Sequence, residues 1–339
     1  MLEQIITEAK PAIGRVIVKV PASTANLGPG FDSLGMALSL FAWVSMAPSQ
    51  ETRITLVGDH LEGVATDKTN LVYEVAQSVF RKAGVEIPEL DIGIRSDIPL
   101  TRGLGSSASA IVGALAAANA LTGNALSDDE LFQMATALEN HPDNVGASLF
   151  GGIVVAAWDG KRAEYVRIEP PKDMSVMVAI PQFELSTKKA RNVLPEQISM
   201  KDAVFNVTHS SLLTAALASG RLDLLSHSMR DRLHQPYRAA LVPGMETILR
   251  EATEHGALGA VLSGAGPTLL FLSKSKQAGS GKLEAFVNKV MSAEGIEVSI
   301  RWLEICLHGP QVRFIGENEP EFALSSRQLL QFAEAEVNV

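Results

Sequence analysis

Short segments in which apolar and polar residues alternate recur along the chain, and this period of two predicts β-strands. Other short segments are apolar throughout and predict buried strands. Residues 256–273 predict two strands joined by the glycine-rich turn SGAGPT. The other segments predicted as strands are 15–20, 90–99, 151–158 and 175–180.

A second set of segments has apolar residues three and four positions apart, the spacing of one helical face. Residues 71–84 follow it, and Gly84 ends the predicted helix. A capping box of Ser127 and Glu130 starts another helix, which runs to about Asn140. Helices are also predicted over 108–122, over 202–235 with a break at Gly220, and in the first part of 282–305, whose second part predicts a strand.

Strands and helices alternate without the regular rhythm of a doubly wound sheet, so the pattern predicts an α+β fold. The segment EPPKD at 169–173 is the best candidate for a boundary between two halves. We expect an N-terminal domain over 1–170, a C-terminal domain over 171–320 and a tail over 321–339.

The chain of 339 residues has a formal net charge of -9. This acidic balance argues against nucleic acid or an anionic membrane surface as the main partner. Cys306 is the single cysteine, which excludes an intrachain disulfide and fits a reducing compartment. The longest apolar run, 108–121, falls short of the ~18 residues of a spanning helix. Because the N-terminus also lacks a signal-peptide pattern, we expect a soluble, cytoplasmic protein.

Three glycine-rich segments are candidates for a binding site: ANLGPGFDSLG (25–35), RGLGSSAS (102–109) and SGAGPT (263–268). None of them fits either of two familiar phosphate motifs. The dinucleotide fingerprint lacks its third glycine in GPGFDS and in GAGPTL. The segment GSGKL only approaches a Walker A loop, because Leu283 follows Lys282 where serine or threonine is needed.

The segment GLGSSAS at 103–109 has the residue order of an anion site. Gly103 and Gly105 permit backbone conformations closed to other residues, and Ser106 and Ser107 add hydroxyl donors. A helix begins directly afterwards, and the free N–H groups of a helix N-terminus attract phosphate. Close packing of the helix on a sheet explains the same residues equally well, so these residues alone leave both interpretations open.

Together the three segments resemble, in the same order, motifs of the GHMP kinase superfamily. PLTRGLGSSAS is similar to its ATP phosphate loop, VLSGAGPTLLF to the C-terminal glycine motif that supports this loop, and VPASTANLGPGFDSLGMAL to its N-terminal substrate motif. The resemblance implies a two-lobed fold, with one half like ribosomal protein S5 and a ferredoxin-like C-terminal half. It also implies that ATP binds at Pro99, Leu100, Thr101, Arg102, Gly103, Leu104, Gly105, Ser106, Ser107, Ala108 and Ser109.

Within the superfamily, HPDNVGASLFGG (141–152) and STKKARNVLP (186–195) resemble the homoserine kinases. Asp32 would hold the ammonium group of L-homoserine, and Asn26 would hold its hydroxyl. Planar guanidinium groups suit its carboxylate. The substrate site implied by this resemblance comprises Asn26, Asp32, His141, Asn144, Thr187, Arg191, Arg238 and Gly264.

Ordinary structural roles remain the alternatives for these residues. Asn26 and Asp32 could merely close an Asx turn beside glycine and proline. A solvated helix face is the alternative for Arg191, and Arg232 competes with Arg238 for the carboxylate. Arg102 departs from the small residue usual at its position, so it either adds charge near ATP or points to solvent.

Magnesium is expected beside the phosphates. Glu139 stands at the negative end of a predicted helix, where a carboxylate is disfavoured by ~0.3–1 kcal/mol, and a broken local rule often marks function. The resemblance implies that Glu139 and the Ser107 hydroxyl bind Mg²⁺, which takes one or two protein oxygens with phosphates and waters. A solvated surface glutamate is the alternative.

The expected reaction is phosphorylation of the homoserine hydroxyl, with Ser107, Glu139 and Asn144 as the catalytic residues. Asn144 stands where mevalonate kinases carry a catalytic aspartate, and an amide does not accept a proton as a carboxylate does. We therefore expect direct in-line attack without a clear general base. Another small-molecule kinase of the superfamily and a catalytically silent ligand sensor stay open as alternatives. The resemblance also implies a homodimer.

Overall fold

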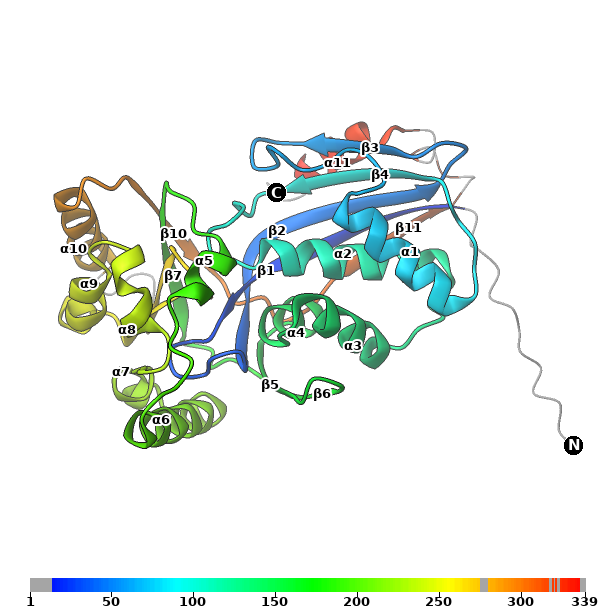
Figure 1. The fold of residues 1–339 in the computed structure, drawn as a ribbon. Coiled ribbons are helices and arrows are strands. Elements are labelled where there is room, and N and C mark those ends of the chain that lie inside the picture. Colours follow the sequence, from blue (N-terminus) through cyan, green and yellow to red (C-terminus); the bar gives the residue numbers. More distant parts are fainter. Residues whose placement is uncertain (1–13, 275–279, 317–318, 320, 322–323, 336–339) are drawn as a thin grey trace, which may run out of the picture.

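The fold consists of two β-sheets that lie side by side, each with its own helices (Figure 1). The structure is a computed structural model that describes residues 14–274, 280–316, 319, 321 and 324–335. The first sheet has seven strands and the second has four. The predicted α+β class is confirmed.

The first sheet is built on two long antiparallel strands, β1 (Gly14–Ala25) and β2 (Leu34–Pro48). Its strand order is β11-β1-β2-β4-β3, and β5 extends it by pairing with β2 and with β6. Strands β3 and β4 pair in parallel, and α1 (Leu71–Ala83) connects them. The other strands of this sheet are β3 (Arg53–Val57), β4 (Leu90–Ser96), β5 (Ile153–Trp158), β6 (Ala163–Ile168) and β11 (Gln311–Gly316).

Strands β1, β4 and β5 are confirmed predictions, whereas β2, β3, β6 and β11 were not predicted. In β2 nearly every side chain is buried, so the sequence carries no alternation that would mark a strand. β3, β6 and β11 are short, and most of their side chains are at least partly exposed. Strands of this kind give a weak hydrophobic signal.

Helix α2 (Ser106–Leu121) lies at the centre of the N-terminal half, and nearly all of its residues are buried. The expectation of a single apolar face is therefore wrong for this helix. It packs against β1 and β2, and α1, α3 (Asp128–Glu139) and α4 (Asp143–Phe150) surround it. Its many alanines and Gly113, where a Cβ would meet the Val44 side chain, permit this close approach. The predicted capping box of α3 is confirmed.

The second sheet has the strand order β10-β7-β9-β8. In chain order this is 4-1-3-2, the arrangement of the ferredoxin-like half that the family resemblance implies. All of its predicted strands are confirmed. They are β7 (Ser175–Pro181), β8 (Gly259–Leu262), β9 (Leu269–Ser273) and β10 (Val298–Leu303).

The segment 202–235 was predicted to be one helix with a break at Gly220, and the structure differs. Helix α6 (Met200–Ser219) ends at Gly220 as expected, but only very short helices follow it. The Asp231 carboxylate accepts hydrogen bonds from the backbone N–H groups of Leu233, His234 and Gln235, and this arrangement starts a new helix. The remaining elements of this half are α5 (Thr187–Asn192), η1 (Leu222–Leu224), α7 (Leu225–Ser228), α8 (Gln235–Arg238), η2 (Ala239–Leu241), α9 (Met245–Glu251), η3 (Ala252–His255) and α10 (Ser280–Ala293).

After β10 the chain returns to the first sheet. β11 pairs with β1, so residues 311–316, which were expected in the C-terminal domain, belong to the N-terminal sheet. This pairing satisfies the backbone groups of β1 that would otherwise form an exposed edge. Helix α11 (Ser326–Ala335) then packs on the sheet face opposite α2 (Figure 1).

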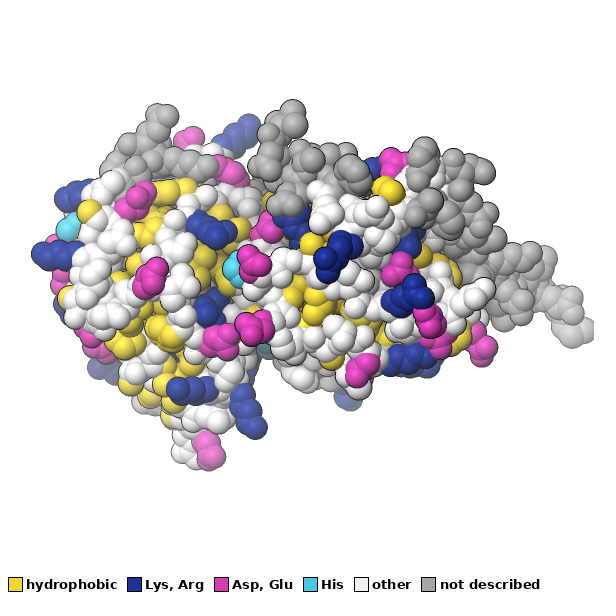
Figure 2. Space-filling view, turned by 90° about the horizontal axis from the view of Figure 1, so that it is seen from above, with side chains coloured by type: hydrophobic (Ala, Val, Ile, Leu, Met, Phe, Trp, Pro, Cys, Tyr) yellow, Lys and Arg dark blue, Asp and Glu magenta, His cyan; other side chains and the backbone are white. Residues whose placement is uncertain are grey.

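Acidic and basic side chains are interspersed on the face shown in Figure 2, without a broad basic patch. Among the described residues, no helix combines the length and the apolar character needed to cross a bilayer.

Candidate active site between the two halves

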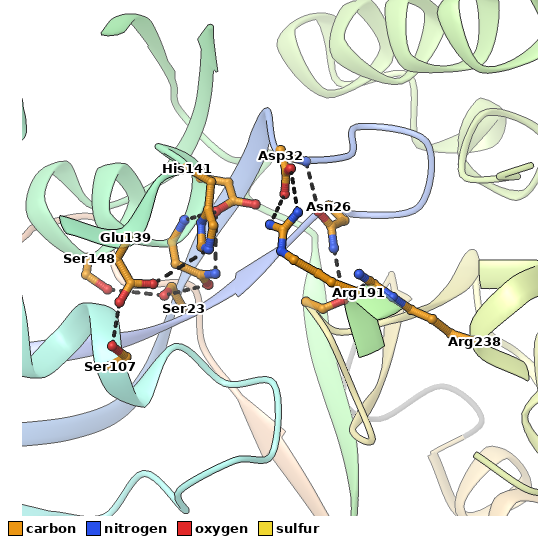
Figure 3. A network of polar contacts seen from close by, with 12 residues as sticks. Ser23, Asn26, Asp32, Ser107, Glu139, His141, Ser148, Arg191 and Arg238 are labelled. Atoms are coloured by element: carbon orange, nitrogen blue, oxygen red, sulfur yellow. Dashed lines mark hydrogen bonds and ion pairs between the residues drawn. The ribbon is translucent and has the colours of Figure 1, made fainter. Parts of the chain in front are cut away.

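A pocket of about 360 Å³ opens where the two halves meet. It is lined by every residue predicted to bind the substrate or the metal, or to act in catalysis. These residues are Asn26 and Asp32 after β1, Ser107 on α2, Glu139 at the end of α3, His141 and Asn144 around the start of α4, Thr187 and Arg191 on α5, Arg238 on α8, and Gly264 between β8 and β9. Figure 3 shows side chains converging from separate elements of both halves, among them Asn26, Asp32, Ser107, Glu139, His141, Arg191 and Arg238.

The predicted phosphate loop forms one wall of this pocket. Gly105 has a left-handed backbone (φ 69°) and directly precedes α2, so the first N–H groups of that helix lack helical acceptors. The loop residues that line the pocket are Thr101, Gly103, Gly105, Ser106, Ser107 and Ala108. The other predicted loop residues, Pro99, Leu100, Arg102, Leu104 and Ser109, do not line it.

The turn between β8 and β9 holds the phosphate loop from behind. Ser263 donates from its hydroxyl to the Gly103 carbonyl over 2.6 Å, and the hydroxyls of Ser263 and Thr24 lie 2.8 Å apart. Gly103 has φ +75°, and a Cβ there would collide with the Ser263 carbonyl oxygen. The SGAGPT segment thus supports the loop, as the family resemblance implies, and only glycine fits at 103.

Two oxygen-bearing side chains meet in front of α2. The Ser107 hydroxyl donates a short hydrogen bond to Glu139, whose side chain is 13% exposed. Among the described residues, no group of three or more His, Cys, Asp or Glu side chains forms a metal cage. A hydroxyl and a carboxylate at the mouth of an anion site fit a cation that takes most of its other ligands from phosphates and water.

His141 lies between two carboxylates. Its Nδ1 is 2.7 Å from Asp143, and its Nε2 is 3.7 Å from Glu139. Burial acts to lower the pKa of His141, but the hydrogen bond to Asp143 and the charges of Asp143, Glu139 and Asp32 outweigh it, so the pKa is raised. The three carboxylates thus favour the protonated form of the His141 ring.

Asn144 belongs to the first turn of α4, and its backbone N–H donates a hydrogen bond to the Asp143 carboxylate over 2.7 Å. The Asn144 Oδ1 accepts a hydrogen bond from the Ser23 hydroxyl over 3.0 Å. These contacts fix the amide at the pocket floor.

Asp32 and Arg191 form a two-pronged ion pair across the pocket, with N–O distances of 3.0 and 2.7 Å (Figure 3). The hydrogen bond to Asp32 is the main cause that raises the pKa of Arg191. Both side chains remain more than a third exposed. Each therefore carries a charge that a ligand in the pocket can reach.

Arg238 is a buried cation, with 1% of its surface exposed. Its guanidinium donates to the backbone carbonyls of Ala190 and Gly264 and to Nδ1 of His234. Burial and the nearby charge of Arg191 lower its pKa to about 10, so it stays protonated at neutral pH. No carboxylate among the described residues forms an ion pair with it. Asp32, Asp231 and Asp143 lie near enough to offset part of its charge, but a buried guanidinium without a direct ion pair still favours a bound anion.

Arg232, the competitor of Arg238 for the carboxylate, lies elsewhere. It pairs with Asp202 over 3.2 Å and covers the Phe205 ring, and it does not line the pocket. The structure therefore leaves Arg238 as the candidate.

Asn26 is held by the protein through both ends of its amide. Its Nδ2 donates to the Gly264 carbonyl over 2.9 Å, and its Oδ1 accepts from the Asp32 backbone N–H over 3.0 Å. The Asn26 side chain thus closes the loop before Asp32. This is the turn-closing role that the sequence analysis gave as the alternative to substrate binding.

Backbone strain is concentrated around the pocket. Among the described residues, six other than glycine have positive φ, and five of these line the pocket or directly adjoin residues that do. They are Asn26, Leu27, Asp32, Thr101 and Asn140. Strained conformations persist where the surrounding structure over-determines them, and they cluster at functional sites.

Comparison with known proteins shows the family to which this chain belongs. Residues 70–152 match the model for the GHMP kinases N terminal domain, and residues 213–293 match the model for the GHMP kinases C terminal domain. A homoserine kinase of Deinococcus radiodurans is 45% identical over 279 residues, which are 82% of this chain and 91% of the relative. A homoserine kinase of Moorella thermoacetica is 43% identical and covers 87% of this chain and 99% of its own. The chain belongs to the homoserine kinase family of GHMP kinases.

A solved structure agrees with this assignment. The homoserine kinase from Cytophaga hutchinsonii superimposes with a TM-score of 0.81 at 29% identity, and covers 92% of this chain and all of its own. The two-lobed GHMP kinase fold implied by the sequence motifs is thus confirmed.

Asp143 also lines the pocket, although it was not predicted from the sequence. Its side chain is 2% exposed, and it accepts hydrogen bonds from His141 and from the Asn144 backbone. The motif HPDN contains it, but an aspartate in the first turn of a helix is also an ordinary favourable charge. Only the tertiary structure shows that it orients two pocket residues.

Proposed function

We propose that the chain phosphorylates the hydroxyl of L-homoserine with ATP to form O-phospho-L-homoserine, a step of threonine biosynthesis. One observation carries the proposal: a zwitterion site of Asp32, Arg191 and Arg238 faces an anion-binding helix N-terminus in one pocket. The curated relatives named homoserine kinase support it.

The amino-acid part of the substrate fits the charges of the pocket. The α-carboxylate binds the guanidinium groups of Arg238 and Arg191, with the Thr187 hydroxyl as a neutral donor. The α-ammonium group takes the place of Arg191 as the partner of Asp32. Asp32 and Arg191 neutralise each other as an ion pair, so a bound amino acid exchanges one ion pair for two.

ATP is expected to lie along the loop formed by residues 101–108. The free N–H groups at the start of α2 and the hydroxyls of Ser106 and Ser107 suit its phosphates. Leu138 lines both this pocket and a neighbouring hollow beside α1. That hollow gives the base and ribose a place outside the homoserine site.

Ser107 and Glu139 are the residues that we expect to hold Mg²⁺. Bound there, the ion supplies positive charge to the phosphates that are being transferred. Ser107 and Glu139 hydrogen-bond to each other, which keeps both oxygens at the pocket mouth.

Asn144 and Asp143 orient the reacting end rather than accept a proton. Asn144 is uncharged, and the Oδ1 atom of Asp143 accepts hydrogen bonds from His141 and from the Asn144 backbone, which holds this carboxylate against its neighbours. We therefore infer direct in-line attack, in which the hydroxyl oxygen forms the new bond to phosphorus while the bond to the ADP oxygen breaks. The hydroxyl proton passes to a phosphate oxygen or to water.

A homodimer, a cytoplasmic location and the domain limit near residue 170 also remain predictions. Helix α6 offers a face for a second copy, since Met200, Val204 and Val207 are exposed by 78%, 53% and 65%. The other exposed residues on this face, Ser211, Ala215 and Ala218, are small and uncharged, so two copies can pack without charge repulsion. Light scattering of the Val207→Glu variant tests this dimer interface. We expect the variant to have the mass of a monomer. A mass equal to that of the unmodified dimer would contradict an interface at α6.

The decisive assay couples ATP consumption to L-homoserine, mevalonate, galactose and L-threonine in turn. We expect turnover with L-homoserine far above that with the other three. Preference for mevalonate or galactose would support another kinase of the superfamily. Binding of ATP and homoserine without phosphate transfer would support a silent sensor.

A further inference from the structure

The Arg102 side chain leaves the phosphate loop and reaches the other half of the molecule. Its Nε donates to the Pro181 carbonyl over 3.1 Å, and its Nη2 donates to the Gln182 carbonyl over 3.3 Å. Its Nη1 donates back to the carbonyl of Leu100 over 3.1 Å. One guanidinium therefore ties the loop to the end of β7, the strand that leads toward α5.

Backbone contacts reinforce the same junction. The Leu185 N–H donates to the Thr101 carbonyl over 3.1 Å, and the Thr268 N–H donates to the Arg102 carbonyl over 3.3 Å. Leu185 stands two residues before Thr187, where α5 begins. The loop expected to hold ATP and the helix expected to hold the homoserine carboxylate are thus joined through residues 101–102 and 181–185.

Arg102 does not point into solvent, because its side chain is only 13% exposed, so that interpretation from the sequence is wrong. The side chain also does not line the pocket, and the charge that it was expected to add near ATP stays a prediction. Its charged partner is Glu184, whose carboxylate lies 3.6 Å away and whose side chain is 71% exposed. An ion pair with so exposed a partner contributes little to stability. The planar fork of donors, rather than the positive charge, is what the site uses.

We propose that Arg102 is a positioning residue that fixes the distance between the two substrates of the reaction. This inference rests on the proposed function, because it assigns ATP to the loop and homoserine to the α5 side of the pocket. In-line transfer needs the attacking oxygen close to the phosphorus, and a misplacement of about 1 Å costs roughly 100-fold in rate. Arg102 acts through the backbone that it holds and touches neither substrate.

Steady-state kinetics of Arg102→Met and Arg102→Lys test the proposal. Both variants should lose at least about tenfold in kcat, with each KM within about threefold of the original, because the separate sites stay intact. Lysine should not rescue, since it keeps the charge and loses the fork. Arg167→Met is the matched control: Arg167 also donates to two backbone carbonyls, those of Phe150 and Leu307, but outside the pocket.

A second readout is independent of turnover. Calorimetry of L-homoserine with and without a non-hydrolysable ATP analogue gives the coupling between the two sites. We expect the coupling to be lost in both Arg102 variants and kept in the Arg167 variant.

Three outcomes overturn the proposal: an unchanged kcat in folded Arg102→Met, full rescue by lysine, or a raised KM for ATP with normal kcat. If the methionine variant does not fold, the kinetics and coupling of the lysine variant decide. An inactive unmodified protein contradicts the proposed function instead, and the coupling measurement still tests Arg102.

Discussion

Replacing Arg238 by methionine removes a buried positive charge and keeps the length of the side chain. An arginine ordinarily titrates above pH ~12, so a pKa lowered to about 10 means that the folded state holds this proton less tightly than the unfolded chain. This penalty is fully present at neutral pH. It is lost only as the pH rises above about 10, the pKa of Arg238 in the folded state. It amounts to about 3 kcal/mol of stability.

Methionine relieves this penalty but also removes the three hydrogen bonds that Arg238 makes. A hydrogen bond from a charged donor is worth about 1.5–3 kcal/mol. The loss of three such bonds outweighs the relieved penalty, so we expect the free energy of unfolding to fall by roughly 2–6 kcal/mol. A cooperative unfolding curve of the variant is therefore measured before its kinetics.

Substrate binding should respond far more strongly. Removing one partner of a buried, hydrogen-bonded charge pair costs about 2–5 kcal/mol, which is at least a 30-fold loss in kcat/KM for L-homoserine. The assay couples ADP formation to NADH oxidation over a range of L-homoserine concentrations. Arg221→Met is the control, since Arg221 is 59% exposed and pairs with Asp223 on the surface.

A second substrate isolates the interaction with the carboxylate. 3-Aminopropan-1-ol is homoserine without its carboxylate, so the unmodified protein and Arg238→Met should use it equally poorly. If the variant loses as much with this amine as with homoserine, Arg238 does not bind the carboxylate. A homoserine kcat/KM within threefold of the original refutes the reasoning outright.

Three further variants test the phosphate side of the pocket. Glu139→Gln should lower kcat about 100-fold and raise the Mg²⁺ concentration needed for half-maximal rate; an unchanged Mg²⁺ titration contradicts the metal role. Asn144→Asp adds a carboxylate to an acidic corner and should lower kcat without a new ionisation in the pH–rate profile; faster turnover with a new pKa would show that a general base is useful here. Gly103→Ala should destabilise by several kcal/mol and weaken ATP binding, whereas Gly123→Ala, also at positive φ but in open space, should cost only about 1 kcal/mol; equal unfolding curves for the two would contradict the close contact.

Local signals predicted much of the fold. The capping box of Ser127 and Glu130, the stop at Gly84 and the alternation in 90–96 act between near neighbours, so the sequence contains the whole cause. β11 could not be predicted in this way. Its place depends on the free edge of β1 almost 300 positions earlier in the chain. Burial of α2 on all sides likewise depends on the elements that surround it.

The same contrast applies to the pocket. The order of residues in the family motifs is itself a signal in the sequence. It allowed the prediction that Ser107, Glu139 and Arg191 lie in one pocket. The directions of Arg102 and of the Asn26 amide depend on carbonyls at Pro181 and Gly264, far along the chain. Tertiary contacts of this kind leave no local pattern in the sequence.

The central claim is that one pocket binds a zwitterionic amino acid beside ATP and transfers phosphate to its hydroxyl. Phosphorus NMR of the purified protein with ATP, Mg²⁺ and L-homoserine tests it most directly. We predict a phosphomonoester signal that grows as the γ-phosphate signal falls, and none when L-threonine or mevalonate replaces L-homoserine. ATP consumption that releases only inorganic phosphate, or an equal product signal with mevalonate, would contradict the claim.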